Sequence, residues 1–111
     1  MKKEFINIPI KESDLKIIKY LERKLNYTLD YIINIAISRY FIKFKLNTSF
    51  RSMRKKYDGL KNEPCDTCRV SLFSSTINNY KEMVDKFCLN KNGLRSNLIH
   101  DALREYMKVI L

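Results

Sequence analysis

Glycine and proline are rare in this chain, with only two of each among 111 residues. This scarcity of turn-forming residues argues against an all-β or loop-rich fold and favours helices. Histidine occurs once, and the sequence contains neither a glycine-rich phosphate loop nor a cluster of carboxylates. Because no set of nucleophile, base and metal ligands can be assembled from such a sequence, we predict that the protein is not an enzyme.

A long hydrophobic run is also missing. The most apolar segment, residues 29–46, is interrupted by Asp30, Asn34, Arg39, Lys43 and Lys45. A membrane-spanning helix needs about 20 mostly apolar residues, so we expect a buried helix here and no membrane partner. The first residues of the chain do not resemble a signal peptide, and the expected location is therefore the cytoplasm.

The three cysteines, Cys65, Cys68 and Cys88, allow a zinc site, a disulfide or free thiols. A zinc site needs four ligands, and His100 is the only other candidate. Cys68 is expected at the start of a strand and His100 in the middle of a helix, which disfavours convergence on one ion. We therefore predict free thiols, no metal and no cofactor, with a Cys65–Cys68 disulfide as the alternative.

Positive charge dominates, because 22 Lys and Arg face 12 Asp and Glu, for a net charge of +10. Such an excess fits a polyanionic partner, since each cation that neutralises a phosphate releases counterions. A basic surface that serves only solubility is the alternative. The length fits one compact domain or two very small units that share a core.

The first half of the chain predicts a strand followed by two helices. Alternation in residues 5–10 places Ile6, Ile8 and Ile10 on one strand face, and Phe5, Asn7 and Pro9 on the other. Apolar residues then recur at helical spacing in two stripes, Leu15, Ile18, Leu21 and Leu25, and Leu29, Ile32, Ile33, Ala36, Tyr40 and Phe44. We expect Ser13 and Thr28 to cap these helices, Glu12 and Asp14 to suit the first helix dipole, and Asn26 to end that helix in the left-handed conformation.

The second half repeats the pattern. Val70 and Leu72 face one way in a strand from Thr67, while Arg69, Ser71 and Phe73 face the other. Ser74 or Ser75 is expected to cap a helix with the stripe Ile77, Tyr80, Met83, Val84 and Phe87, and Asn92-Gly93 to end the region. A last helix is expected from about Leu94 to Val109, with an inward stripe of Leu98, Ile99, Ala102, Leu103, Tyr106 and Ile110.

The two copies align at nearly constant offsets. Ser13 and Ser75 lie 62 positions apart, whereas Ala36 and Ala102 lie 66 apart. The extra four residues fall in the segment 89–93, where an insertion into a loop costs little. The sequence is therefore an internal repeat of strand, helix and helix.

The alternating strands and the second helices resemble ribbon-helix-helix proteins of the Arc/MetJ type. The segment Arg95–Tyr106 is close to the family pattern, and Asn34–Tyr40 is a looser version. The resemblance covers residues 4–46 and 67–110. The tandem arrangement also resembles transcription regulators of archaeal filamentous viruses, which would place the protein in the host cytoplasm or nucleoid.

The resemblance implies a mainly α fold with a two-stranded antiparallel β-ribbon, in which two units form an intrachain pseudo-dimer. The expected divisions are a first unit in residues 1–46, a basic connector in 47–66 with a possible short helix, and a second unit in 67–111. Ile35, Ile37, Phe41 and Ile42 widen the apolar face of the second helix, which suggests further self-association.

In such a fold the exposed ribbon face enters the major groove of double-stranded DNA. The predicted base-contacting residues are Phe5, Asn7, Thr67, Arg69 and Ser71. The predicted phosphate-contacting residues are Lys3, Lys11, Thr28, Leu29, Leu94, Arg95, Ser96, Arg54, Lys55 and Lys56. The alternative is that these are ordinary solvated residues and helix caps, and Pro9 fits the strand only if its nitrogen points away from the partner strand.

The leading hypothesis from the sequence is a sequence-specific DNA-binding transcription regulator. One alternative is an antitoxin-like module that grips a protein partner and binds DNA for autoregulation. Another is a protein that coats DNA without sequence preference.

Overall fold

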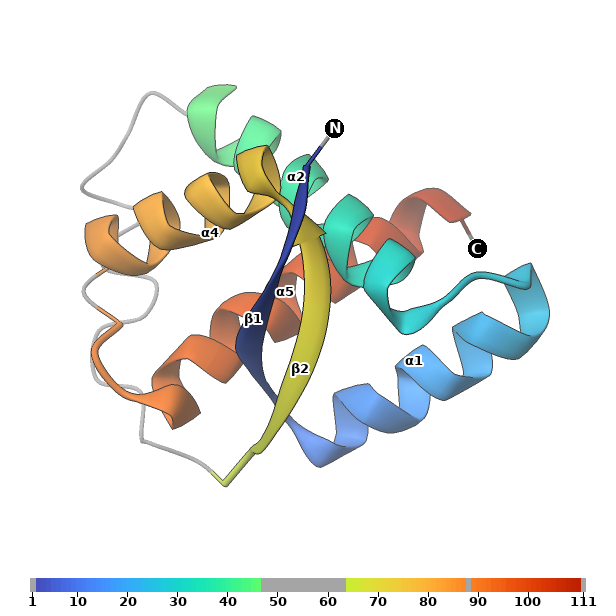
Figure 1. Ribbon diagram of the computed structural model, residues 1–111. Helices are drawn as coiled ribbons and strands as arrows, with labels where there is room; N and C mark the ends of the chain where they lie inside the picture. The colour runs from blue at the N-terminus through green and yellow to red at the C-terminus, as the bar shows by residue number, and fades with distance from the viewer. Residues whose placement is uncertain (1, 47–63, 88, 111) are drawn as a thin grey trace.

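The computed structural model describes residues 2–46, 64–87 and 89–110. This part of the chain is mainly helical, with four helices and one two-stranded antiparallel sheet (Figure 1). In chain order the elements are β1 (Lys3–Ile10), α1 (Glu12–Leu25), α2 (Leu29–Leu46), β2 (Asp66–Phe73), α4 (Ser74–Lys86) and α5 (Asn92–Ile110). The order strand, helix, helix thus occurs twice.

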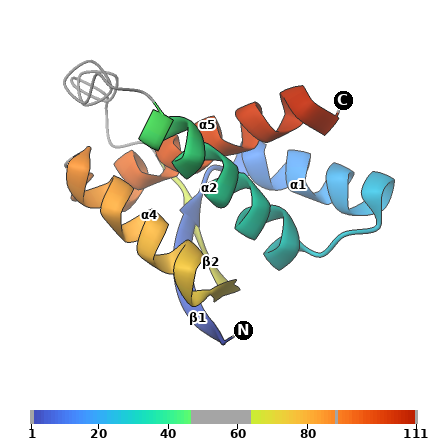
Figure 2. The same ribbon diagram turned by 90° about the horizontal axis from the view of Figure 1, so that it is seen from above.

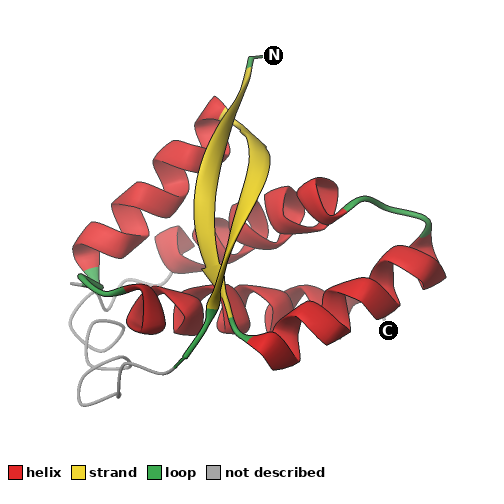
Figure 3. Ribbon diagram, turned by 60° about the horizontal axis from the view of Figure 1, so that its bottom comes forward, coloured by secondary structure: helices red, strands yellow, loops and turns green. Residues whose placement is uncertain are grey.

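The two strands lie side by side although they come from different halves of the chain (Figure 3). In their register Ile6 lies opposite Val70 and Asn7 lies opposite Arg69. The predicted inner face is confirmed: its residues Ile8, Ile10, Val70 and Leu72 have no exposed surface, and Ile6 is half-buried. All helices lie on this side of the ribbon, with α1 and α4 at opposite flanks (Figures 1 and 2).

Pro9 fits the ribbon because its nitrogen points away from β2. The side chain of Asn34 binds the carbonyl of Ser71 and the N–H of Phe73, so these backbone groups face away from β1. In an antiparallel ladder, pairs whose backbone N–H and C=O groups point toward the partner strand alternate with pairs whose groups point away from it. The pair Pro9–Thr67 is separated from the pair Phe5–Ser71 by an even number of positions, so its backbone groups also point away from the partner strand. Pro9 is nevertheless buried rather than exposed, because β1 enters the core at its end; the exposed outer face of β1 stops at Asn7.

The predicted ends around the α1–α2 turn are confirmed. Asn26 terminates α1 with φ 56° and ψ 40°, the left-handed conformation that asparagine tolerates. The hydroxyl of Thr28 accepts a hydrogen bond of 3.2 Å from the N–H of Tyr31 at the start of α2. Two polar residues therefore set the boundaries of this turn.

The predicted serine caps of the other two helices are wrong. Each strand runs almost directly into its helix, so the capping position falls on Lys11 or on Phe73, which have extended backbones and no side-chain cap. Ser13 lies inside the first turn of α1, and Ser75 lies in the first turn of α4. The hydroxyl of Ser74 donates to the carbonyl of Lys2.

The expected stop at Asn92-Gly93 is also wrong, because α5 begins there. The carbonyl of Lys91 accepts the N–H groups of Leu94 and Arg95, and Gly93 is buried in the first turn. α4 has already ended at Lys86, followed by the buried Phe87 and Leu89. The chain therefore turns earlier than the glycine suggests.

A single core joins residues of all six elements, and it contains most residues of the four predicted helix stripes. It also contains Ile37, which is only 1% exposed. Of the residues expected to widen the outer face of α2, Ile35 and Phe41 are partly buried and Ile42 is 59% exposed. The proposed self-association face is therefore smaller than predicted, because Ile37 is used within the chain.

Candidate nucleic-acid interface

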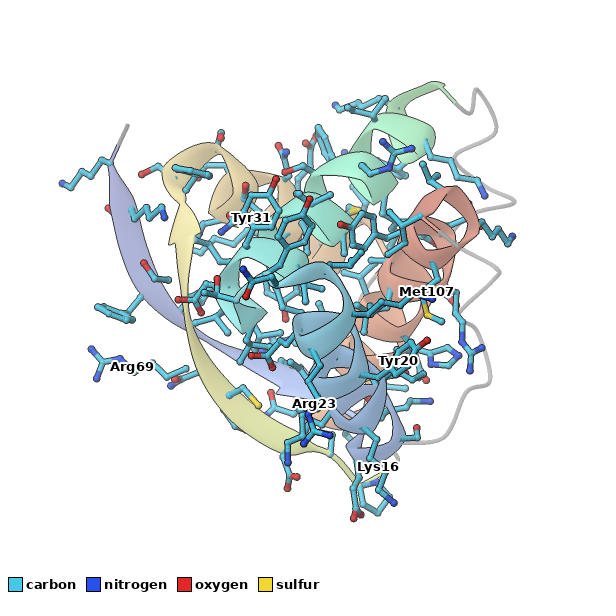
Figure 4. All side chains as sticks on the ribbon, turned by 90° about the vertical axis from the view of Figure 1, so that its right-hand side faces the viewer. Lys16, Tyr20, Arg23, Tyr31, Arg69 and Met107 are labelled. Atoms are coloured by element: carbon cyan, nitrogen blue, oxygen red, sulfur yellow. The ribbon has the colours of Figure 1, made fainter. Side chains whose placement is uncertain are left out.

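The outer face of the ribbon carries the five residues predicted to contact bases. Phe5, Asn7, Thr67 and Arg69 are exposed, and Ser71 is half-buried. The register pairs Asn7 with Arg69 and Phe5 with Ser71, so these side chains share one face. Figure 4 shows Arg69 projecting from the ribbon away from the helices.

Arg69 does not extend freely into solvent but lies over the aromatic ring of Phe5. Its guanidinium carbon is 4.4 Å from the ring centroid, within the range of a cation–π contact. A second contact of this kind lies at the other end of the ribbon, where Lys3 Nζ is 4.9 Å from the centroid of Phe73. Phe5, Asn7 and Arg69, together with Ile6, line a shallow hollow. The sequence had indicated these residues but not their contacts.

At the start of α2 the backbone N–H groups that could bind a phosphate are available. No described residue accepts a hydrogen bond from the N–H groups of Leu29 and Asp30. Thr28 is exposed, although its hydroxyl oxygen already accepts the cap bond from Tyr31. Backbone N–H groups at a helix start attract anions, so Leu29 can contribute its amide rather than its side chain.

At the start of α5 two of the three groups predicted to contact phosphate are already engaged within the chain. The N–H of Leu94 is already donated to Lys91 because the helix begins earlier. Ser96 has no exposed surface, and its hydroxyl donates to the carbonyl of Gly93 at 2.7 Å. Arg95 also gives its N–H to Lys91, but its side chain is half-exposed.

The side chain of Arg95 lies in a cavity beside β1 that the sequence did not indicate. Its Nε donates to the carbonyl of Leu89 at 2.9 Å, which orients the guanidinium. Lys81 and Asp85 of α4 line the same cavity, together with Asn7 of the ribbon. Tyr80 lines it as well, and burial raises the pKa of this phenol to about 12. The cavity thus joins the outer edge of β1 to cationic side chains.

The remaining predicted phosphate contacts are dispersed. Lys3 is exposed at the start of the ribbon, and Lys11 is half-buried where β1 meets α1. Arg54, Lys55 and Lys56, like most of the predicted connector, lie outside the described residues. Among the described residues, the predicted interface therefore consists of the ribbon, Lys11 and the starts of α2 and α5.

The sequence did not reveal the contacts of two buried polar side chains that join separate elements of the fold. Asn34 bridges α2 to the outer edge of β2, as described above. Asp14 is completely buried, and its carboxylate oxygens lie 2.9 and 3.1 Å from Nδ1 of His100, which joins α1 to α5. The only histidine of the chain was the one signal that could have revealed this contact.

The cysteines that the structure describes, Cys65 and Cys68, are free thiols. Burial, assisted by the nearby Asp66, raises the pKa of the Cys68 thiol. Cys88 lies outside the described residues. Within residues 2–46, 64–87 and 89–110, His, Cys, Asp and Glu nowhere form a group of three that could hold a metal. In the same ranges no helix has the length and apolarity needed to cross a membrane.

No protein-family model matches the chain, and it has no significant match among curated proteins or solved structures. What the protein binds must therefore be argued from its own geometry. The exposed ribbon face offers an amide opposite a guanidinium, with a helix start and an oriented arginine beside it.

Proposed function

We propose that this protein binds double-stranded DNA in a sequence-specific manner by inserting the β1–β2 ribbon into the major groove, and that it regulates transcription. One observation carries the proposal: Asn7 lies directly opposite Arg69 on the exposed face of a ribbon whose other face is buried. A two-stranded ribbon fits the major groove, where each base pair presents a distinct pattern of donors and acceptors.

The chemistry of the exposed face suits base recognition. The guanidinium of Arg69 can donate two hydrogen bonds to O6 and N7 of guanine. The amide of Asn7 can pair with N7 and N6 of adenine, and Thr67 and Ser71 add hydroxyls. Each good bidentate pair contributes about 1–3 kcal/mol of discrimination against a wrong base.

Two ribbon-helix-helix units in an intrachain pseudo-dimer account for this architecture. The repeated element order, the pairing of β1 with β2 and the shared core support this interpretation. Neither strand alone could satisfy its ladder, and a covalent link makes their pairing independent of protein concentration. Because the two halves differ in sequence, the DNA site need not be a palindrome.

The net charge of +10 supplies attraction to the phosphate backbone without sequence preference. The helix start at Leu29, the oriented Arg95 and the exposed Lys3 are suitable phosphate contacts on the two sides of the ribbon. A protein with this function would be found with DNA in the cytoplasm or nucleoid.

Selection of binding sites from random DNA tests the proposal. We expect the chain to select a defined, imperfectly symmetric site, and the variant Arg69→Ala to lose the preference at one or two positions. Lys55→Ala is the comparison, because loss of a phosphate contact weakens all sequences alike and reduces the salt slope by about 1.

Three outcomes would contradict the proposal. Equal affinity for selected and random DNA would indicate a coating protein. A uniform loss of affinity in Arg69→Ala would show that this arginine does not read bases. A protein partner that occupies the helices, with DNA bound only as a complex, would favour the antitoxin-like alternative.

A further inference from the structure

Phe5 is a large apolar side chain in a place where a merely solvated ribbon would carry a polar one. It is 64% exposed on the outer ribbon face, between polar neighbours, and Arg69 lies over its ring. We propose that Phe5 and Arg69 act as one reading unit for a pyrimidine with a C5-methyl group that lies next to a guanine. This inference rests on the proposed function, because it names the base step that the ribbon recognises.

The spacing of the two side chains suits neighbouring base pairs. Phe5 and Arg69 are diagonal neighbours across the ribbon, since Phe5 lies opposite Ser71 and Arg69 opposite Asn7. The guanidinium carbon is 4.4 Å from the ring centroid, close to the rise of about 3.4 Å between bases along a DNA strand. When the guanidinium reaches one base edge, the ring therefore reaches the next.

The chemistry of each side chain selects its target. In the major groove a phenylalanine ring can contact the C5-methyl group of thymine, the only methyl group among the edges of the four standard bases. The guanidinium binds guanine O6 and N7 through its N–H edge, which stacking on a ring leaves free. 5-Methylcytosine presents the same methyl group, so the proposed ligand chemistry is shared by two bases.

The contact with Phe5 also restricts the conformations of the Arg69 side chain before DNA binds. A free arginine side chain samples many rotamers, and their loss opposes binding. The ring limits this freedom through a contact that already exists in the protein alone. Removal of the ring should therefore weaken guanine recognition as well as methyl recognition, whereas removal of the guanidinium should leave the methyl preference partly intact.

The test uses the DNA site selected by the unchanged protein and alters one chemical group of that site at a time. Each thymine next to a guanine is replaced by deoxyuridine, which removes only the methyl group. We expect the affinity of the unchanged protein to fall about fourfold at one such position, the effect of losing one buried methyl group. In a second arm this position carries a C·G pair, and we expect 5-methylcytosine to bind more tightly than cytosine, because the two differ only by the C5-methyl group.

The variant Phe5→Ala should bind the thymine and deoxyuridine sites equally. The control Tyr20→Ala removes another exposed aromatic ring, 53% exposed on α1 and remote from the ribbon (Figure 4), and should retain the fourfold difference. Phe5→Leu, which keeps an apolar side chain, should retain part of it, and thermal unfolding of each variant reports whether the fold is intact.

The inference fails if deoxyuridine binds like thymine in the unchanged protein, or if the difference persists in Phe5→Ala. Either result leaves the proposed function standing as long as the chain selects a defined site whose guanine depends on Arg69. A chain that selects no preferred sequence would overturn both.

Discussion

The two halves of the chain use different chemistry at equivalent places. Asn34 of α2 and His100 of α5 lie 66 positions apart, the offset that relates the second helices of the repeat. Asn34 binds the edge of β2 through neutral hydrogen bonds of 3.1 and 3.2 Å. His100 instead binds the carboxylate of Asp14, which belongs to the first helix of the other half.

Matching positions in the first helices, α1 and α4, also carry different polar groups. Asp14 and Thr76 lie 62 positions apart, and both are buried in the first turn of their helices. Thr76 shares a neutral hydrogen bond of 3.2 Å with Ser38, whereas Asp14 depends on an imidazole. Matching positions in the two strand–helix–helix segments therefore make different polar contacts.

The largest expected effect comes from Asn34→Leu. This change leaves the carbonyl of Ser71 and the N–H of Phe73 without their Asn34 partner at a partly buried edge, at a cost of about 3 kcal/mol. The free energy of unfolding in urea measures it. Asn78→Leu, at an exposed position of α4, is the control and should stay within about 0.5 kcal/mol; equal losses would deny Asn34 its special role.

The contact between Asp14 and His100 should rank next. Asp14→Ala is expected to destabilise the fold by about 2 kcal/mol, because hydrogen bonds to charged groups are stronger than neutral ones. A double-mutant cycle with His100→Ala isolates the pair, and we expect a coupling energy of about 1 kcal/mol or more. Strictly additive losses would show that the two side chains do not stabilise each other.

The neutral counterpart should be weaker. Thr76→Val preserves the shape of the side chain and removes only its hydrogen bond with Ser38, at a cost of about 1 kcal/mol. Thr67→Val, at an exposed position of β2, serves as the control in the same urea measurement. A loss from Thr76→Val that exceeds that from Asp14→Ala would reverse the comparison of the two halves.

The smallest effect is expected at the surface, where Glu105 accepts hydrogen bonds from Lys43 at 2.8 Å and Lys108 at 3.1 Å. These lysines hold the pKa of Glu105 below its ordinary value. The stabilisation is therefore complete above the unfolded-state pKa and is lost as the pH falls through the folded-state value. Glu105→Gln should cost about 0.5 kcal/mol at neutral pH, and the stabilities of the two proteins should converge as the pH falls below the lowered folded-state pKa of Glu105.

Patterns among residues close together in the sequence correctly predicted the features that depend on such neighbours: the strand faces, the helix stripes and the turn between α1 and α2. Alternation identified the inner faces of both strands, and helical spacing identified most of the core. Asn26 and Thr28 marked their turn correctly because each acts on its own backbone neighbourhood. The prediction that a helix stops at Asn92-Gly93 was wrong because glycine suits both a left-handed turn and a closely packed position. The burial of Gly93 in the first turn of α5 shows that the second property is used here.

The sequence predicted which residues of the candidate site lie on the outer faces of the strands, but it did not predict which residues contact one another. The sequence places Asn7 and Arg69 on strands, and the alternation assigns each to an outer face. Ser96 and Ile37 carried suitable side chains for the predicted contacts, yet both are buried in the folded chain. Burial of this kind depends on which elements meet, and the local pattern does not contain that information.

Composition and periodicity by themselves determined the helical character of this protein, the two amphipathic strands and the excess of positive charge, because these depend on residues within a few positions of each other. Only the tertiary structure decided that Asn7 lies opposite Arg69, that Arg69 lies over Phe5 and that Asp14 binds His100. Each of these contacts joins residues more than 60 positions apart in the chain. Their geometry follows from the pairing of the two strands and from the core that all the helices share.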